Sequence, residues 1–370
     1  MASLNPIKYL RFIARVHRYS RKVKDRTSLS FTQQLAEVYR LLKLNQLEPK
    51  EYYETYELFA NDLTWEDKTR FLSRNQFAKM DERLNPRKSY GLLNKLVFHV
   101  YAERFDLPMP RMYGLFDPRH GWTAEGEPLS TVEDLEKFLA RPELDQFLFK
   151  PISTDQARGI IVCGIENGNL IELGKGEITA ADLHQRLSGT HHSKCAHVED
   201  SYIIEERVKQ HPWYDRYGKD FVHHFRIVTF LASDGEVEYV GGTMGIGLSG
   251  HYIHVAGVRG VSSGIDENYC LKPAVRAVDS GMEYLHNHPE TGALIAGEKL
   301  PGFEESLALA LKAQKYIPHM RCLGWDVVPT ERGPVILEGN PFWNWEKFQR
   351  SNRRGLIRGK LAAELPKILK

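Results

Sequence analysis

Three oxygen-bearing side chains occur close together near residue 330. Gly324 to Val328 and Val335 to Asn340 are apolar runs joined by the polar turn Thr330 to Gly333, which predicts a β-hairpin. Asp326 lies in the first strand. Glu338 and Asn340 are two apart in the second, so their side chains point to the same side. Mg²⁺ prefers such oxygen ligands and completes its shell with water and phosphate oxygens. The segment therefore predicts a platform for a magnesium nucleotide, or else an ordinary hairpin with a polar solvent face.

Basic side chains at two other places have the chemistry to hold phosphate. Lys150 closes the apolar strand 147–151 and is followed by the polar loop 153–159. Backbone N–H groups in such a loop can point at an anion, although the order of a Walker A loop is absent. Arg226 lies within the strand run 225–230, where a charged side chain needs a partner. That partner is either an anionic ligand or a nearby acid.

The composition describes an ordinary globular chain of 370 residues, with 42% hydrophobic and 26% charged residues, which is long enough for two or three lobes. A net charge of +2 argues against a dedicated nucleic-acid binder. No apolar run is long enough for a membrane span, and the first residues lack a signal-peptide pattern. The cysteines match no zinc or redox spacing, so we expect reduced thiols in a cytoplasmic protein: Cys163, Cys195, Cys270 and Cys322.

The first 80 residues predict helices. Capping boxes are expected at Ser30 to Gln33 and at Thr64 to Asp67, the second with Asp in place of Glu. Residues 5–24 form a basic amphipathic pattern. This helix either docks on an anionic membrane surface or packs on the protein with a solvated basic face.

From residue 92 onward, helices and strands alternate. We expect a helix over 92–105 and another that opens with a capping box from Ser130 to Glu133. Strands follow from residue 147, and the glycine-rich stretch 236–264 favours strands with turns. Two further helices are expected over 301–317 and 354–370.

Taken in order, these features resemble the ATP-grasp superfamily from Leu92 to the C-terminus. The stretches His288 to Gly292, Gly324 to Asp326 and Leu337 to Pro341 resemble its sugar-transfer-associated branch, which is similar to alpha-L-glutamate ligase-like proteins. The resemblance implies an α+β ATP-grasp fold, in which two α+β lobes clasp ATP, here preceded by a helical N-terminal region. The implied division is a helical region over 1–88, a small lobe with the ATP-binding lysines over 89–200, and a large lobe with the adenine linker and Mg²⁺ site over 201–370.

The resemblance also implies roles for nucleotide-binding residues. Lys95 and Lys150 would hold the ATP phosphates from two sides, with Gly159 in the loop that follows Lys150. Lys95 could instead be a surface lysine on its helix. The strand 202–208 would lead into the adenine-binding linker. There the backbone around Glu206 and Val208 would read the adenine edge.

The acids that end this strand, Glu205 and Glu206, would otherwise face solvent. Arg226 and Lys150 are the implied catalytic residues, with Arg226 facing the transferring phosphoryl group or the acyl-phosphate oxygens. The implied metal ligands are Asp326, Glu338 and Asn340.

The chain departs from the branch at the acceptor side of the cleft. It has His223-His224 where the branch tends to carry Asn-Thr, and His254-Val255 and Arg259-Gly260 where the branch tends to carry an Asp-Asn pair. The pair His223-His224 is either a metal or base site, or two histidines of the core or a loop. These departures leave the acceptor open.

The leading interpretation is an ATP-dependent carboxylate–amine ligase that uses Mg²⁺ and forms an amide through an acyl phosphate. The branch association suggests an amino acid, a uronic acid or a cell-surface glycan precursor as substrate, and polysaccharide-synthesis proteins as partners. The alternative is a small-molecule or sugar kinase that uses the same cleft. A nucleotide-binding partner of a glycosyltransfer complex, without turnover, ranks last because the metal set is intact.

Overall fold

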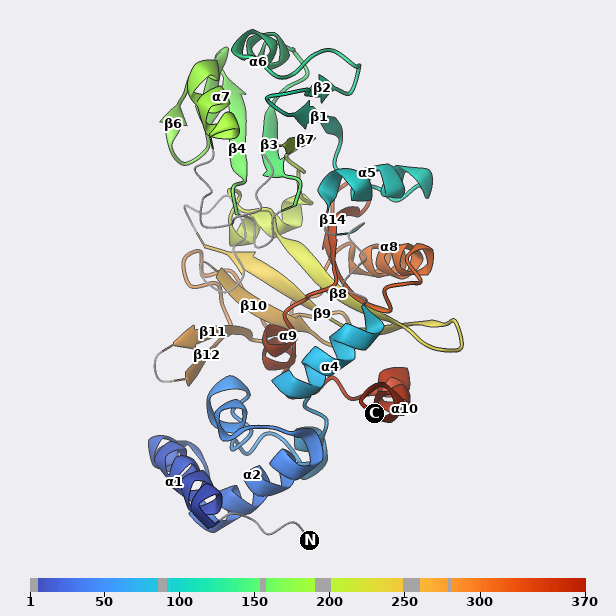
Figure 1. The fold of residues 1–370 in the computed structure, drawn as a ribbon. Helices are drawn as coiled ribbons and strands as arrows, with labels where there is room; N and C mark the ends of the chain where they lie inside the picture. The colour runs from blue at the N-terminus through green and yellow to red at the C-terminus, as the bar shows by residue number, and fades with distance from the viewer. Residues whose placement is uncertain are drawn as a thin grey trace.

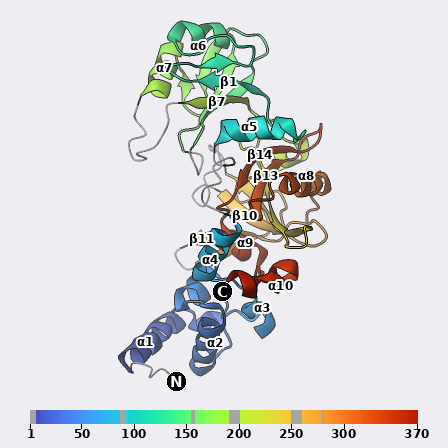
Figure 2. The same ribbon diagram turned by 45° about the vertical axis from the view of Figure 1, so that its right-hand side comes forward.

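The structure is a computed structural model that describes residues 6–85, 92, 94–153, 158–189, 201–248, 260–278 and 281–370. Three tiers follow one another along the long axis of the molecule, with one β-sheet at one end, a second sheet in the middle and a helical region at the other end (Figures 1 and 2). None of the described helices is long and apolar enough to cross a membrane.

The N-terminal tier is helical, as the sequence predicts. Its helices are α1 (Pro6–Lys22), α2 (Phe31–Asn45), α3 (Trp65–Thr69) and α4 (Arg74–Leu84), with short helical turns at Lys24–Arg26 and Glu51–Thr55. Both expected capping boxes form, because Ser30 and Gln33 exchange hydrogen bonds and Thr64 and Asp67 do the same. Buried aromatic and aliphatic side chains from α1, α2 and the Glu51–Thr55 turn make a core of this tier's own.

The first sheet contains β1 (Met112–Phe116), β2 (Trp122–Thr123), β3 (Gln146–Pro151), β4 (Ile161–Glu166), β5 (Asn169–Glu172), β6 (Gly176–Glu177) and β7 (Tyr202–Glu206). Its order is β2-β1-β7-β3-β4-β5-β6, and the paired strands are antiparallel. Helices α6 (Val132–Leu139) and α7 (Ala180–Ser188) contribute to its core. The sequence division places residues 202–206 in the second lobe, whereas β7 pairs with β1 and β3 inside this first sheet.

One capping box was placed wrongly from the sequence. Helix α6 is capped by Thr131 and Asp134, one residue later than the expected pair of Ser130 and Glu133. The Asp134 carboxylate also accepts the N–H of Ser130 at 3.0 Å, so the shorter acid satisfies both donors ahead of the helix. The expected helices over 92–105 and 354–370 are also shorter, and begin at Lys95 and Gly359.

The second sheet contains β8 (His224–Leu231), β9 (Val237–Gly247), β10 (Gly260–Ile265), β11 (Ala274–Val278), β12 (Gly281–Leu285), β13 (Cys322–Val328) and β14 (Val335–Asn340). Its order is β12-β11-β10-β9-β8-β13-β14. Helix α8 (Phe303–Tyr316) packs on β8, β9 and β13, while α9 (Trp345–Asn352) contacts β9, β10 and β11, and α10 (Gly359–Ile368) contacts α4 and β9. Helix α5 (Lys95–Arg104) lies between the two sheets (Figure 2).

Candidate nucleotide and metal site

Strand register brings four of the predicted residues to one place in the second sheet. Asp326 on β13 pairs with Arg226 on the neighbouring strand β8 and with Glu338 on β14. Asn340 follows two residues after Glu338 and points to the same side, because the two side chains are hydrogen-bonded. A bulge after Asp326 shifts the β13–β14 register. The predicted hairpin is therefore confirmed, with its polar side chains beside Arg226.

Arg226 and Asp326 form a two-pronged ion pair. The Nη2 of Arg226 donates to Oδ2 of Asp326 at 2.8 Å, and its Nε donates to Oδ1. Burial raises the pKa of the Asp326 carboxyl, but the charge and hydrogen bonds of Arg226 oppose burial and the net pKa is lowered. Of the two partners expected for Arg226, the structure shows the nearby acid. A guanidinium held in this way is preorganised beside the cleft.

Glu338 and Asn340 form the second half of this cluster. The Nδ2 of Asn340 donates to Oε1 of Glu338 at 2.9 Å and to Oδ2 of Asp326 at 3.3 Å. Burial and the neighbouring Asp326 charge raise the pKa of Glu338. A carboxylate that is destabilised in this way would be stabilised by a cation, so the donor chemistry fits Mg²⁺.

The fit is closer for Glu338 than for Asp326, because both oxygens of Asp326 already accept from Arg226. In the described residues, no group of three or more His, Cys, Asp or Glu side chains is arranged to hold a metal ion. A magnesium ion here would therefore depend on few protein ligands, as is usual when phosphate oxygens complete its shell.

A second buried cluster lies in the first sheet and α5. Lys150 on β3 donates to Oε2 of Glu205 on β7, and Nε2 of His99 on α5 lies 2.6 Å from the other oxygen, Oε1. Glu205 is 1% exposed. Its burial raises the pKa of this carboxyl, yet the charges and hydrogen bonds of Lys150 and His99 lower it to about 2. The Glu205 side chain therefore holds Lys150 in place and does not face solvent.

Lys95 connects the two clusters. Its backbone N–H donates to the carbonyl of Ile152 at 2.8 Å, which fixes the start of α5 next to the end of β3. The positive charge of Lys95 acts on Glu338 of the second sheet and opposes the rise of the Glu338 pKa. Lys95 thus acts on the Glu338 cluster of the second sheet, while Lys150 belongs to the Glu205 cluster of the first sheet. Gly159, at the far end of the loop after Lys150, has a φ of +75°, a conformation that favours glycine.

The adenine-linker residues have structural contacts of their own. The carboxylate of Glu206 accepts the N–H of Arg111 at 3.0 Å, and the Glu206 N–H donates to the Arg111 carbonyl at 2.9 Å. Val208 is buried. The Glu206 side chain is therefore tied to the segment before β1, and a role in reading adenine stays with the backbone of 206–208 as a prediction.

The two histidines before Arg226 have different surroundings. His223 is fully buried, and its backbone N–H and ring Nδ1 lie 2.8 and 3.0 Å from Oε1 of Gln210. Burial and the nearby His224 and His288 lower its pKa to about 3, so the ring is neutral. His224 instead has Nε2 at 3.7 Å from Oδ1 of Asp326. His254, Val255 and Arg259 lie outside the described residues.

Two residues that bear on these clusters, His99 and Lys347, were not among those predicted from the sequence. His99 stands four residues after Lys95 on α5, and this i, i+4 spacing was a signal that both face the same side. Lys347 on α9 had no comparable signal. Burial and the charges of Arg226 and Arg350 lower the Lys347 pKa to about 8, while the Asp326 charge opposes the shift.

A sequence model described as sugar-transfer associated ATP-grasp matches residues 75–363 of the chain. The chain belongs to this family. The ATP-grasp fold expected from the ordered lysines, arginine and hairpin is thereby confirmed, and the chain falls in the ATP-grasp class of enzymes. The match begins within α4, so the helices before it precede the family's own region. No curated protein matches the chain.

Solved structures with similar folds include D-alanyl-alanine synthetase A from Vibrio cholerae, at 11% identity and a TM-score of 0.44 over 77% of this chain and 67% of that protein. The VanG D-Ala:D-Ser ligase from Enterococcus faecalis has 12% identity and a TM-score of 0.42 over 76% and 62%. Biotin carboxylase from Campylobacter jejuni has 13% identity and a TM-score of 0.40 over 70% and 42%. The chain thus spans less than two thirds of the last two proteins. The family assignment rests on the sequence match and not on these structures.

Proposed function

We propose that this member of the ATP-grasp family is an ATP-dependent carboxylate–amine ligase. The observation that carries the proposal is the Arg226–Asp326 pair beside Glu338 and Asn340 on three adjacent strands, where the charge of Lys95 also acts on Glu338. One guanidinium and one ammonium group can hold the phosphates and the reacting carboxylate together.

In the first step, an oxygen of the substrate carboxylate attacks the γ-phosphorus of ATP. The bond between that phosphorus and the β–γ bridging oxygen breaks, and ADP leaves with its electron pair. In the second step, an amine nitrogen attacks the acyl carbon, phosphate leaves, and the nitrogen releases its proton to solvent or to a nearby base. Arg226 would stabilise the oxyanion of this second step, because preorganised donors stabilise developing charge.

Lys95 and Lys150 would neutralise the triphosphate from the side of α5 and β3. The Lys150 ammonium group would donate to a phosphate oxygen, either in place of Glu205 or in addition to it, because it has three N–H donors. Glu338 and Asn340 would hold Mg²⁺, with Asp326 next to them. When bound, this ion neutralises phosphate charge. The substrate is an amino acid, a uronic acid or a cell-surface glycan precursor, as the sugar-transfer association of the family suggests.

A kinase that phosphorylates a hydroxyl group is the second candidate. The observation in its favour is His224, a titratable ring close to the Arg226–Asp326 pair, with Nε2 3.7 Å from Oδ1 of Asp326. Burial lowers the pKa of His224, against the opposing charge of Asp326, and so favours the unprotonated ring that a general base requires. His223 offers no comparable support, because it is buried against Gln210.

Hydroxylamine distinguishes the two reactions, because it attacks an acyl phosphate to give a hydroxamate and leaves a phosphate ester intact. Carboxylic acids are first screened for acid-dependent ADP release. With the acid so found and no amine, we expect a hydroxamate to form in proportion to ADP in the wild-type protein. Arg226→Lys, which keeps the charge but loses the planar fork, should reduce trapping by roughly a hundredfold. A phosphorylated product that is stable to hydroxylamine would make the protein a kinase.

A further inference from the structure

Helix α1 presents two adjacent stripes on its outer side. Spacings of three and four place a row of basic side chains on one stripe: Lys8, Arg11, Arg15, Arg18 and Lys22. Ile7, Leu10 and Ala14 follow the same spacing next to it, and Ile7 and Leu10 are 60% and 65% exposed. The opposite face of α1 packs on the protein, because Val16 and Tyr19, and Val23 directly after the helix, are buried in the core of the helical tier. Packing on the helical tier therefore accounts for the buried face of α1 but not for the exposed apolar stripe that contains Ile7 and Leu10.

The basic stripe is only partly neutralised by the protein itself. Arg15 pairs with Glu48, and Lys22 Nζ lies 3.4 Å from Glu54. Lys8, Arg11 and Arg18 make no ion pair with any other described residue. Residues 6–26 contain eight Lys or Arg and one acid, while the whole chain has a net charge of +2. Positive charge is thus concentrated at one end of the molecule.

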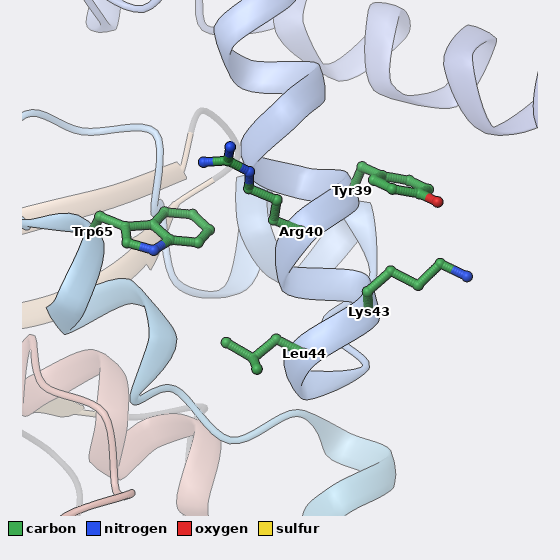
Figure 3. Close-up of a pocket in the computed structure, with 5 residues that line it drawn as sticks. All are labelled: Tyr39, Arg40, Lys43, Leu44 and Trp65. Carbon is green, nitrogen blue, oxygen red and sulfur yellow. The ribbon is translucent and has the colours of Figure 1, made fainter.

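An aromatic and basic hollow lies on the neighbouring helices α2 and α3. Tyr39, Arg40, Lys43, Leu44 and Trp65 line a shallow space of about 450 Å³ (Figure 3). The guanidinium of Arg40 is 5.7 Å from the Trp65 ring centroid, and Lys43 Nζ is 5.6 Å from that of Tyr39. Leu44 is 58% exposed. The Tyr39 ring also contacts Phe12 of α1 at 6.4 Å between centroids, so the hollow adjoins α1.

We propose that the stripes of α1 and the hollow on α2 and α3, together the α1–α3 surface, dock the enzyme on a lipid bilayer that carries anionic headgroups. Exposed aliphatic side chains bordered by basic ones are typical of helices that lie in a membrane interface. Tyr and Trp beside Arg and Lys suit the headgroup level. A polyanion such as RNA would bind the Lys and Arg side chains but would leave Ile7, Leu10 and Leu44 exposed to water. A second copy of this surface would be repelled by its like charge.

The surface lies at the end of the molecule away from the first sheet, as both views show (Figures 1 and 2). It is made by residues 7–65, ahead of the region 75–363 that matches the family. Docking would therefore hold the lipid at the opposite end of the molecule from the first sheet and its Lys150–Glu205 pair. This inference does not depend on the proposed ligase reaction.

Vesicle sedimentation of the full chain tests the proposal. We expect the protein to pellet with vesicles of phosphatidylcholine and phosphatidylglycerol, and not with phosphatidylcholine alone. Binding should weaken as salt shortens the Debye length from about 10 Å at 0.1 M to about 3 Å at 1 M. The double variant Ile7→Glu/Leu10→Glu should bind more than about tenfold more weakly, because it loses apolar area and adds repulsion.

The matched control is Val100→Glu/Leu294→Glu, which adds the same charge at exposed apolar side chains elsewhere, 63% and 47% exposed. It should bind the vesicles almost as the wild type does. Equal loss in both double variants would overturn the proposal, because net charge alone would then explain binding. Leu10→Ser adds no charge and should still weaken binding. An unchanged affinity of Leu10→Ser for vesicles, together with tight binding of polyuridylate, would show a simple polyanion surface instead. No pelleting of the wild type at low salt would also overturn it.

Discussion

Asp326 and Glu338 are neighbours across two paired strands, yet their surroundings act differently on the two carboxyl groups. Arg226 lowers the pKa of Asp326, whereas burial and the Asp326 charge raise the pKa of Glu338. The Arg226 guanidinium thus compensates the charge of Asp326. Glu338 remains the carboxylate that a bound cation would stabilise most. We infer that Glu338 is the principal protein ligand of Mg²⁺ and that Asp326 chiefly orients Arg226.

Glu338→Gln tests this assignment. Removal of a charged ligand beside the transferring phosphate should cost roughly a thousandfold in Mg²⁺-dependent ADP release. Glu331→Gln is the matched control, because Glu331 lies in the exposed turn of the same hairpin. It should turn over normally. Near-normal activity of Glu338→Gln at ordinary Mg²⁺ would contradict the assignment.

The pH dependence of Mg²⁺ activation follows from the same residue. Glu338 must be ionised to bind the ion, and its pKa is raised above the ordinary 4.5. The Mg²⁺ concentration for half activation should therefore rise as pH falls toward this raised pKa. Titrations between about pH 7.5 and 5.5 measure the effect, and Glu331→Gln should show the same slope as the wild type. A half-activation concentration that does not change with pH would argue against Glu338 as a ligand.

At the scale of the elements, the ion pair of Lys150 and Glu205 ties β3 to β7, and His99 ties α5 to β7. Lys150→Ala should weaken ATP binding by roughly tenfold or more, since it removes a cation from the phosphate side of the cleft. Lys175→Ala is the control, because Lys175 also pairs with an acid of the same sheet, Glu172, but is 63% exposed at its side chain. Calorimetry of both variants with Mg-ATP gives the comparison. Equal affinities would exclude Lys150 from the nucleotide site.

The same cluster predicts a loss of stability in acid. Glu205 has a pKa of about 2 in the folded protein, below its ordinary 4.5. A lowered carboxyl pKa contributes stability above the unfolded value, and this is lost as pH falls from about 4.5 to about 2. The shift corresponds to about 3 kcal/mol of the unfolding free energy. Denaturant unfolding across this range should show a shallower pH dependence in Glu205→Gln than in Glu206→Gln, the next residue of the strand. Parallel curves would contradict the assigned role of Glu205.

Local signals explain most of what the sequence could predict. The hairpin, the strand ending in Lys150 and the capping boxes at Ser30 and Thr64 depend on residues within a few positions, and all of them form. The pairing of β7 with β1 and β3 depends on contacts distant in the sequence, so it could not be placed by pattern alone. For the same reason, the partners of Glu205 were not predictable. The prediction that Lys95 and Glu338 belong to one site came from the family resemblance and not from any local pattern.

At the scale of the whole molecule, the helical tier is joined to the second sheet by buried polar contacts. Gln349 of α9 is fully buried, and its Oε1 accepts the N–H groups of Leu72 at 2.8 Å and Leu356 at 3.2 Å. Its Nε2 donates to the Tyr56 hydroxyl at 2.9 Å. Arg353 adds a two-pronged pair with Asp62, at 2.8 Å for both contacts. Residues 349–353 thus supply several of the contacts between the helical tier and the second sheet, beside others such as the Met282 N–H that Glu57 accepts at 3.1 Å.

Gln349→Ala should loosen this joint while both sheets stay folded. The change leaves the N–H groups of Leu72 and Leu356 buried without their acceptor, and each such group costs about 1–3 kcal/mol. Hydrogen exchange should therefore speed up in residues 45–72 and 345–357 and remain slow in β1, β3 and β7. Gln185→Ala, at an exposed position of α7, should change neither region. If the variant accelerated exchange equally in both sheets, the helical tier and the two sheets would be one cooperative unit, in which the helical end cannot move independently of the proposed ATP site. If exchange stayed at the wild-type rate throughout, Gln349 would not be what holds the tier in place.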